Sequence, residues 1–167
     1  MPGIIKRGHG LKTLIKTSTK VALPLLASTA GLLTVHGQSS QEAIQIHQTN
    51  RVILTAPTAA LDSLTFGTGH DTLLLHQAGV LRAIPLIKID SLSPGVVTDT
   101  IKVHYQGDNA TVNLPLELAD MDVHIDGAMV TIDADQLEAP LVFVLEGHSD
   151  NGCFKRYGAQ KATLVLN

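Results

Sequence analysis

The chain has 167 residues, 44% of them hydrophobic and 16% charged, with one Cys and no Trp. A chain of this length can bury a core as one domain or two small ones, and its composition is not that of a disordered protein. A single Cys excludes an intrachain disulfide and a zinc cluster built on paired thiolates. Residues 1–37 carry five bases and no acid, which leaves seven bases against fifteen acids in residues 38–167. This acidic balance argues against a nucleic-acid partner, because phosphate backbones would be repelled.

The first 37 residues have the pattern of an export signal. Their five bases precede an uncharged run over residues 21–35, and small residues stand at the third and first positions before Gln38. This pattern predicts a cleavable signal helix over residues 1–37, cut between Gly37 and Gln38. A membrane anchor is the alternative, but a spanning helix needs about 20 apolar residues and this run is shorter. We therefore expect the mature chain to be secreted, periplasmic or at the cell surface, with no membrane span.

After Gln38, apolar and polar residues alternate in short runs rich in Val, Ile, Leu and Thr. A period of two residues is typical of half-buried strands. Gly, Asp, Asn and Pro separate the runs at intervals of about ten residues, as in all-β domains. The sequence therefore predicts an all-β fold of short antiparallel hairpins in a meander. The clearest runs are Ile44–Ile46, Ile101–Tyr105, Val112–Leu118 and Leu141–Leu145.

One hairpin can be predicted in register. Asp126-Gly127 has the sequence of a two-residue type I′ turn. The flanking apolar residues then share one face of the hairpin, and a slip of one residue would bury Asp122 and His124 instead. The predicted pairs are Ile125 with Ala128, Val123 with Val130 and Met121 with Ile132.

Residues 38–97 contain a two-copy repeat. Ile44–Gln48 reappears as Leu73–Gln77, and Pro57 followed by an Asp-Ser-Leu sequence at 62–64 reappears as Pro85 followed by the same sequence at 90–92. Each copy predicts a strand, a reversal, a second strand and a short closing strand. So small a unit cannot bury its own apolar face, so we expect the copies to pack together or onto residues 98–167.

Two stretches resemble known protein groups. The repeat, with its His-Gln opening and its closing sequence Asp62–Phe66, resembles an N-terminal module of secreted and surface proteins of Gram-negative bacteria. From Thr100 onward, the chain resembles the start of a bacterial family of carbohydrate-binding domains with a right-handed parallel β-helix fold. The matching residues are Ile101–Tyr105, Val130–Ile132, Val142–Gly147, Ser149–Gly152 and Lys161–Asn167.

The second resemblance implies a calcium-bearing β-helix that binds cellulose or pectin. It implies that residues 98–167 form the cap or first rung of that β-helix, and that the chain is truncated at Asn167 relative to the family. The rungs that carry calcium and sugar in the family would lie beyond this point. We therefore expect no cofactor in this segment, with calcium belonging to the full-length family, and polysaccharide, including acidic plant glycan, as the partner.

Acidic and His residues raise the question of a metal site. Asp120, Asp122, Asp133 and Asp135 gather around the predicted hairpin and could offer calcium its oxygen ligands, although they lack the spacing of a calcium-binding loop. Solvated turn carboxylates are the alternative. The eight His residues lack ligand spacing, and the repeat equivalence of His47 and His76 favours a structural hydrogen bond instead.

A basic group near the end of the chain is the candidate glycan site. Lys155, Arg156 and Lys161 surround Tyr157 in an otherwise acidic region. Arg could bind a carboxylate of an acidic glycan with two hydrogen bonds, and the Tyr ring could stack on a sugar. A solvated strand face is the alternative reading.

No catalytic residue is predicted. The Asp-Ser pairs at 62–63 and 90–91 lack the glycines of a nucleophile elbow, and no His partner for Cys153 is placed by the sequence. The first hypothesis is therefore an exported, non-catalytic carbohydrate-binding protein, not an enzyme. A structural or adhesive surface module is the second, and a polysaccharide lyase or hydrolase, which rests on fold analogy alone, is the third.

Overall fold

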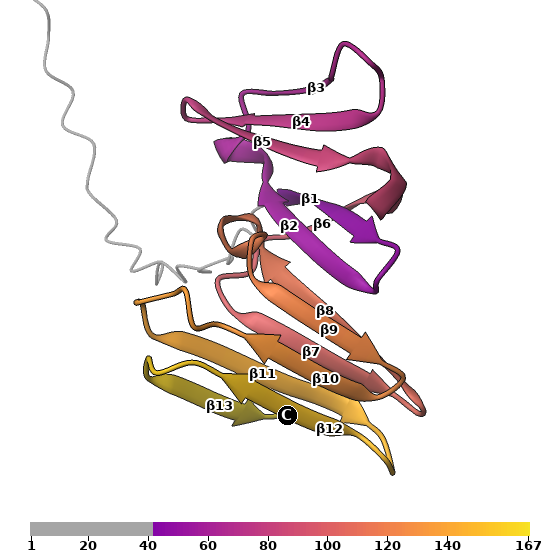
Figure 1. Cartoon of the computed structure of the whole chain (residues 1–167), viewed down its shortest axis with the longest axis vertical. Helices are drawn as coiled ribbons and strands as arrows, with labels where there is room; N and C mark the ends of the chain where they lie inside the picture. The colour runs from indigo at the N-terminus through magenta and orange to yellow at the C-terminus, as the bar shows by residue number, and fades with distance from the viewer. Residues whose placement is uncertain (1–41) are drawn as a thin grey trace, which may run out of the picture. The chain divides into compact units, whose positions relative to one another are not determined.

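Residues 42–167 are the part of the chain that the computed structural model describes, and they form thirteen strands and three short 3-10 turns (Figure 1). The predicted all-β class is confirmed. The predicted signal helix and its cleavage site at Gly37–Gln38 lie outside the described residues. Within residues 42–167, no helix is long and apolar enough to span a bilayer.

The strands are β1 Glu42–Gln48, β2 Val52–Pro57, β3 Ser63–Phe66, β4 Thr72–Gln77, β5 Val80–Pro85, β6 Ile89–Val96, β7 Ile101–Gln106, β8 Asn109–Pro115, β9 Asp122–Asp126, β10 Met129–Asp133, β11 Leu141–His148, β12 Cys153–Tyr157 and β13 Ala162–Leu166, and the turns are η1 Thr58–Ala60, η2 Leu86–Lys88 and η3 Leu116–Leu118.

The strands form three sheets around one apolar core. Sheet A has the order β13-β11-β7-β8-β2-β1-β6, sheet B the order β3-β4-β5 and sheet C the order β12-β10-β9. Inward-facing side chains of all three sheets belong to one buried cluster, in which Ile46 and Val103 of sheet A, Leu75 of sheet B and Ile132 of sheet C are fully buried. Sheet A runs through both the 38–97 and the 98–167 segments, because β2 pairs with β8.

The repeat is present in the structure and has a third copy. The hairpins β1–β2 and β4–β5 each end in a proline, Pro57 or Pro85, that begins a 3-10 turn. The hairpin β7–β8 ends in the same way at Pro115, which begins η3. A fixed φ near −60° suits proline to the first position of such a turn, and its missing N–H removes no ladder bond there.

The first two copies exchange their closing strands. β6, which closes the second copy, pairs with β1 of the first, while β3, which closes the first copy, pairs with β4 of the second. Two equivalent hydrogen bonds mark this exchange: His47 Nε2 lies 2.8 Å from Ser93 Oγ, and His76 Nε2 lies 3.0 Å from Thr65 Oγ1. The two copies are therefore interlocked units of one fold, as expected for units too small to fold alone.

The hairpin β9–β10 has the predicted faces but a different register. Val130 lies opposite Ile125 and Ile132 opposite Val123, so the predicted pairs are wrong by two residues. The turn residues are Gly127 and Ala128, with Gly127 at φ +58° in the first central position, where type II′ turns place glycine. A shift of two residues keeps every side chain on its face, which explains why the predicted faces survive.

The last four strands alternate between two sheets. The chain passes from β10 in sheet C to β11 in sheet A, then back to β12 in sheet C and to β13 in sheet A. β12 pairs parallel to β10, and β13 pairs parallel to β11. These parallel pairings contrast with the antiparallel hairpins that precede them.

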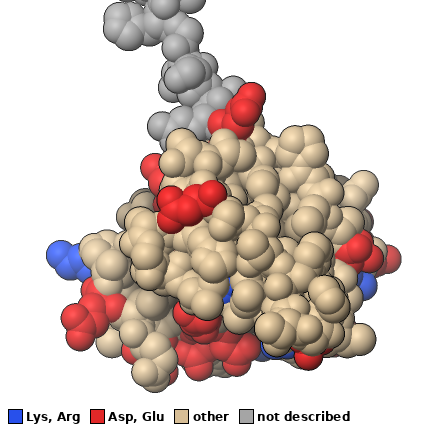
Figure 2. Space-filling view, turned by 90° about the horizontal axis from the view of Figure 1, so that it is seen from above, with Lys and Arg blue, Asp and Glu red and all other residues tan. Residues whose placement is uncertain are grey.

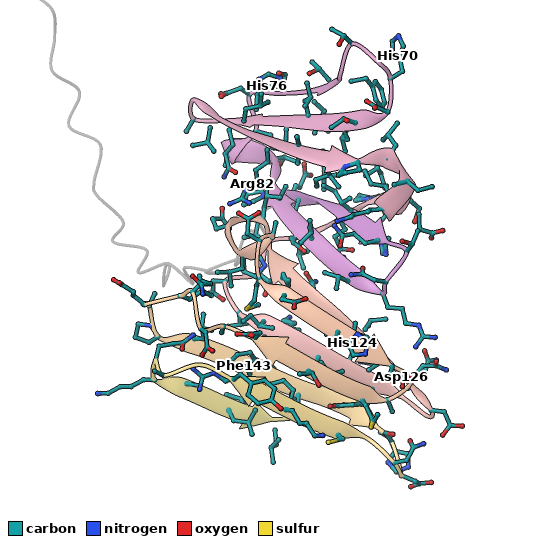
Figure 3. All side chains as sticks on the ribbon, viewed as in Figure 1. His70, His76, Arg82, His124, Asp126 and Phe143 are labelled. Carbon is teal, nitrogen blue, oxygen red and sulfur yellow. The ribbon has the colours of Figure 1, made fainter. Side chains whose placement is uncertain are left out.

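Arg82 joins sheet B to the start of sheet C. It occupies the position that Leu54 and Val112 hold in the other two copies, and its guanidinium Nη1 lies 2.8 Å from Asp120 Oδ2, just before β9 (Figure 3). Its Nη2 donates to the Glu117 carbonyl at 3.2 Å. An inward-pointing charge on β5, an edge strand of sheet B, is a device that keeps such an edge from pairing with other strands.

Candidate functional site

The outward face of sheet C gathers residues from both predicted sites. Along β10, Val130 and Ile132 are buried and Phe154 of β12 packs on the same core. Because side chains alternate along a strand, the intervening residues face outward. We call these nine residues the sheet C face: Asp122, His124 and Asp126 of β9, Met129, Thr131 and Asp133 of β10, and Cys153, Lys155 and Tyr157 of β12.

The strand pairing arranges the sheet C face in three rows. With adjacent strands about 4.8 Å apart and alternate residues about 6.7 Å apart, the face measures roughly 10 by 13 Å between Cα atoms. Figure 3 labels His124 and Asp126 on β9, at one side of the face. The rows are Asp126 with Met129 and Cys153, His124 with Thr131 and Lys155, and Asp122 with Asp133 and Tyr157.

The row with Tyr157 combines an exposed aromatic ring with two carboxylates. Tyr157 is 55% exposed, and Asp122 and Asp133 lie directly opposite each other on β9 and β10. Like charges in directly opposed positions destabilise a sheet, so this pair contributes nothing to folding that neutral residues would not. Carboxylates accept short hydrogen bonds from hydroxyl groups, and an aromatic ring offers an apolar surface with a polar tip.

The predicted basic group is divided by the structure. Lys155 and Tyr157 share the sheet C face, but Arg156, one residue between them, points to the opposite side and is half-buried. Its Nη2 donates to the Gln160 carbonyl at 2.7 Å, and Gln160 Nε2 donates to the Ala134 carbonyl at 2.8 Å. Arg156 therefore holds the loop after β12, and Lys161, at the end of that loop, is exposed and does not belong to the three rows.

The four Asp residues that were predicted as possible calcium ligands do not converge on one point. Asp120 pairs with Arg82, and the Asp133 Oδ1 accepts the backbone N–H of Asp135 at 3.0 Å. Asp122 and Asp133 remain neighbours on the sheet C face. In the described part of the chain, no three His, Cys, Asp or Glu side chains are grouped so as to hold a metal ion.

Tyr105 of β7 packs against the apolar core, close to the start of β12. It is half-buried, and burial, with a smaller effect of the Cys153 thiol group, raises the pKa of its phenol above the ordinary value of 10.0. Its ring borders a hollow of about 330 Å³ that Phe154 and Leu166 also line. Tyr105 is therefore a core residue at the end of the fold rather than a member of the sheet C face.

Two members of the sheet C face, Thr131 and Met129, were not singled out from the sequence. Both alternate with buried residues of β10, so the period-two pattern was the available signal. Their position beside Lys155 and Cys153 depends on the parallel pairing of β12 with β10, across some twenty intervening residues.

Comparisons of the chain with models of known protein families, with curated proteins and with solved structures found no match. The sheet C face therefore has to be interpreted from its own chemistry.

Proposed function

We propose that this protein is an exported, non-catalytic polysaccharide-binding protein that holds its glycan on the sheet C face. The observation that carries this proposal is the row in which the exposed ring of Tyr157 lies beside the opposed carboxylates of Asp133 and Asp122. A ring and flanking hydrogen-bond acceptors on a flat sheet suit an extended sugar chain. In this proposal β10–β13 are the first turn of a parallel β-helix, at the cell surface, in the periplasm or outside the cell.

The charges of this face favour a neutral glycan. Three carboxylates, Asp122, Asp126 and Asp133, stand against the one ammonium group of Lys155. A polyuronate chain would be repelled by this balance unless a divalent cation bridged the two sets of carboxylates. We therefore propose a neutral β-glucan of the cellulose type as the preferred ligand, and acidic plant glycan as a ligand that requires calcium.

Affinity electrophoresis of the full chain tests this proposal. Gels that contain hydroxyethylcellulose are expected to retard the protein, and Tyr157→Ala is expected to abolish the retardation. Phe66→Ala is the matched control, because Phe66 is 60% exposed on sheet B, close to the 55% of Tyr157. Gels with polygalacturonate are expected to retard the chain with added calcium and not with a chelator. Equal mobility of the wild type and Tyr157→Ala in all gels would refute the proposal.

A structural or adhesive surface module is the second candidate function. The interlocked repeat of residues 42–96, whose closing strands are exchanged, favours it, because this arrangement builds a scaffold rather than a cleft. Absence of retardation by any glycan, together with an intact fold, would support this candidate. New reducing ends in the polysaccharide after incubation would instead support a lyase or hydrolase.

A further inference from the structure

Three hollows adjoin one another around Asp120, which lies in the loop between η3 and β9. The first, of about 380 Å³, lies beside β5, and the second, of about 530 Å³, lies beside the start of β9. Gln48, Lys88 and Asp120 line both of them. The third, of about 360 Å³, shares Asp120 and Asp122 with the second. We call the three hollows together the Asp120 furrow.

The Asp120 furrow begins where the proposed glycan row ends. Asp122 and Asp133 form a row with Tyr157 on the sheet C face, and both also line the third hollow. The row runs across sheet C from β12 to β9, and β9 is an edge strand of this sheet. A chain that lies along the row and continues past β9 therefore passes Asp122 and reaches Asp120 and the second hollow.

An ion pair holds the Asp120 carboxylate at the centre of the furrow. Arg82 Nη1 lies 2.8 Å from Asp120 Oδ2, and Arg82 Nη2 donates to the Glu117 carbonyl at 3.2 Å (Figure 3). The Asp120 side chain is nevertheless 90% exposed, so its other oxygen can accept a hydrogen bond from a ligand. A carboxylate that is already oriented loses little freedom when it binds.

Charges of both signs balance along the first two hollows. Arg82 and Lys88 stand there against Asp120 and Asp122. Sheet B is different, because Arg82 is the one Asp, Glu, Lys or Arg residue of β3, β4 and β5. Figure 2, which views the chain from the side of sheet B, shows a largely uncharged surface with charged groups mainly near its margin. A neutral ligand with many hydroxyl groups therefore finds polar partners in the furrow and no net charge.

The walls and the floor of the second hollow differ in polarity. Gln48 and Thr49 line it with an amide and a hydroxyl group, which both donate and accept hydrogen bonds, as sugar hydroxyl groups do. Val52 and Leu114 also line it and are buried in the core. A few polar groups around an apolar base are typical of ligand sites, and they suit a sugar ring with its C–H faces and hydroxyl edges.

We propose that the glycan held on the sheet C face continues over β9 into the Asp120 furrow, where Asp120, Gln48 and Lys88 bind it. This inference rests on the proposed function and deepens it, because it makes the site one for a long chain rather than for a short oligosaccharide. The Tyr157 row and the furrow are successive parts of one site. A peptide strand is a poorer occupant, since the charge of Arg82 on the edge of β5 opposes strand pairing.

Calorimetric titration of the full chain with cellotriose and with cellohexaose tests this inference. The wild type is expected to bind both, and cellohexaose more tightly. The double variant Gln48→Ala and Lys88→Ala is expected to bind cellotriose like the wild type and cellohexaose about tenfold more weakly, the net worth of one or two hydrogen bonds. Its unchanged affinity for cellotriose shows that it is folded.

Lys161→Ala is the matched control for the loss of an exposed lysine. Lys161 is exposed like Lys88 but belongs neither to the rows of the sheet C face nor to the lining of the three hollows. This variant is expected to bind both oligosaccharides like the wild type.

The two oligosaccharides separate this inference from the proposed function. A wild type that binds cellotriose and cellohexaose equally tightly would overturn the inference and leave the proposed function in place. A double variant that binds cellohexaose as tightly as the wild type would do the same, because the longer chain would then gain its affinity outside the furrow. A wild type that binds neither oligosaccharide would contradict the proposed function, and the inference with it.

Discussion

Gly147 lets two strands approach more closely than any residue with a side chain allows. It lies in β11 at φ +91°, and a Cβ built on it would overlap the Tyr105 carbonyl oxygen on β7. The position therefore needs glycine for two separate reasons, its left-handed backbone and the lack of space.

We predict that Gly147→Ala lowers the free energy of unfolding by about 2–5 kcal/mol, the range set by left-handed strain together with overpacking. Gly79→Ala is the control, because Gly79 has φ +82° but no atom near the built Cβ, and about 1–2 kcal/mol is expected there. Urea unfolding followed by far-UV circular dichroism measures both losses. Equal losses at the two positions would show that the close approach to Tyr105 has no cost.

Tyr105 links stability to alkaline pH. Burial raises the pKa of its phenol above 10.0, so the folded chain holds this proton more tightly than the unfolded chain does. The resulting stability is fully present below the unfolded pKa near 10 and is lost as the pH rises through the raised folded pKa.

We predict that the free energy of unfolding of the wild type falls more steeply between pH ~9 and pH ~12 than that of Tyr105→Phe. The phenylalanine keeps the ring in the core and removes the ionisation. Urea titrations of both proteins at several pH values supply the comparison. Parallel pH profiles would mean that Tyr105 ionises equally easily in the folded and unfolded chains.

At the scale of elements, the hydrogen bonds of His47 and His76 hold the exchanged closing strands. Each bond joins a hairpin strand of one copy to the closing strand of the other, through Ser93 or Thr65. The His47 bond is half-buried and the His76 bond is exposed, so water competes less with the first.

We predict a coupling free energy of about 0.5–1.5 kcal/mol between His47 and Ser93 in a double-mutant cycle to Ala, and a smaller one between His76 and Thr65. His47 with Thr65 is the control cycle, since these residues belong to different pairs, and no coupling is expected. Chemical denaturation of the single and double variants gives these values. A control coupling as large as that of the true pairs would remove the hydrogen bonds as its explanation.

In this protein, the sequence predicts where the strands lie and which face each buries better than it predicts which strands pair with one another. Period-two patterning placed Val123, Ile125, Val130 and Ile132 on one face correctly, yet it could not choose between registers two residues apart, because both keep the same faces. The exchange of β3 and β6 has no local signal either, since each closing strand resembles the other at Asp-Ser-Leu and could close either hairpin.

The same limit applies to the repeat and the candidate site. The third copy keeps the apolar-x-apolar-His opening as Ile101–His104 and its proline as Pro115, but it lacks the closing Asp-Ser-Leu that revealed the first two. Lys155 and Tyr157 were predicted together, and alternation alone could have placed Arg156 on the opposite side. Their proximity to Asp133 depends on a parallel pairing that local patterning does not determine.

At the scale of the molecule, the two sequence segments share one sheet and one core. β2 of the repeat pairs with β8, and Ile46 belongs to the same buried cluster as Val103. Loss of packing in the repeat should therefore reach residues 98–167 through sheet A, which makes the described part of the chain a single cooperative unit.

We predict that Ile46→Ala lowers the unfolding midpoint reported by tyrosine fluorescence, with a loss of about 2–5 kcal/mol. The chain has no Trp, and its two tyrosines, Tyr105 and Tyr157, both lie outside residues 42–96, so their signal reports on residues 98–167 alone. Far-UV circular dichroism, which reports on all strands, should give the same midpoint, and Val103→Ala should shift both signals together. If Ile46→Ala moved the circular dichroism transition and left the tyrosine transition in place, the two segments would unfold independently despite their shared sheet.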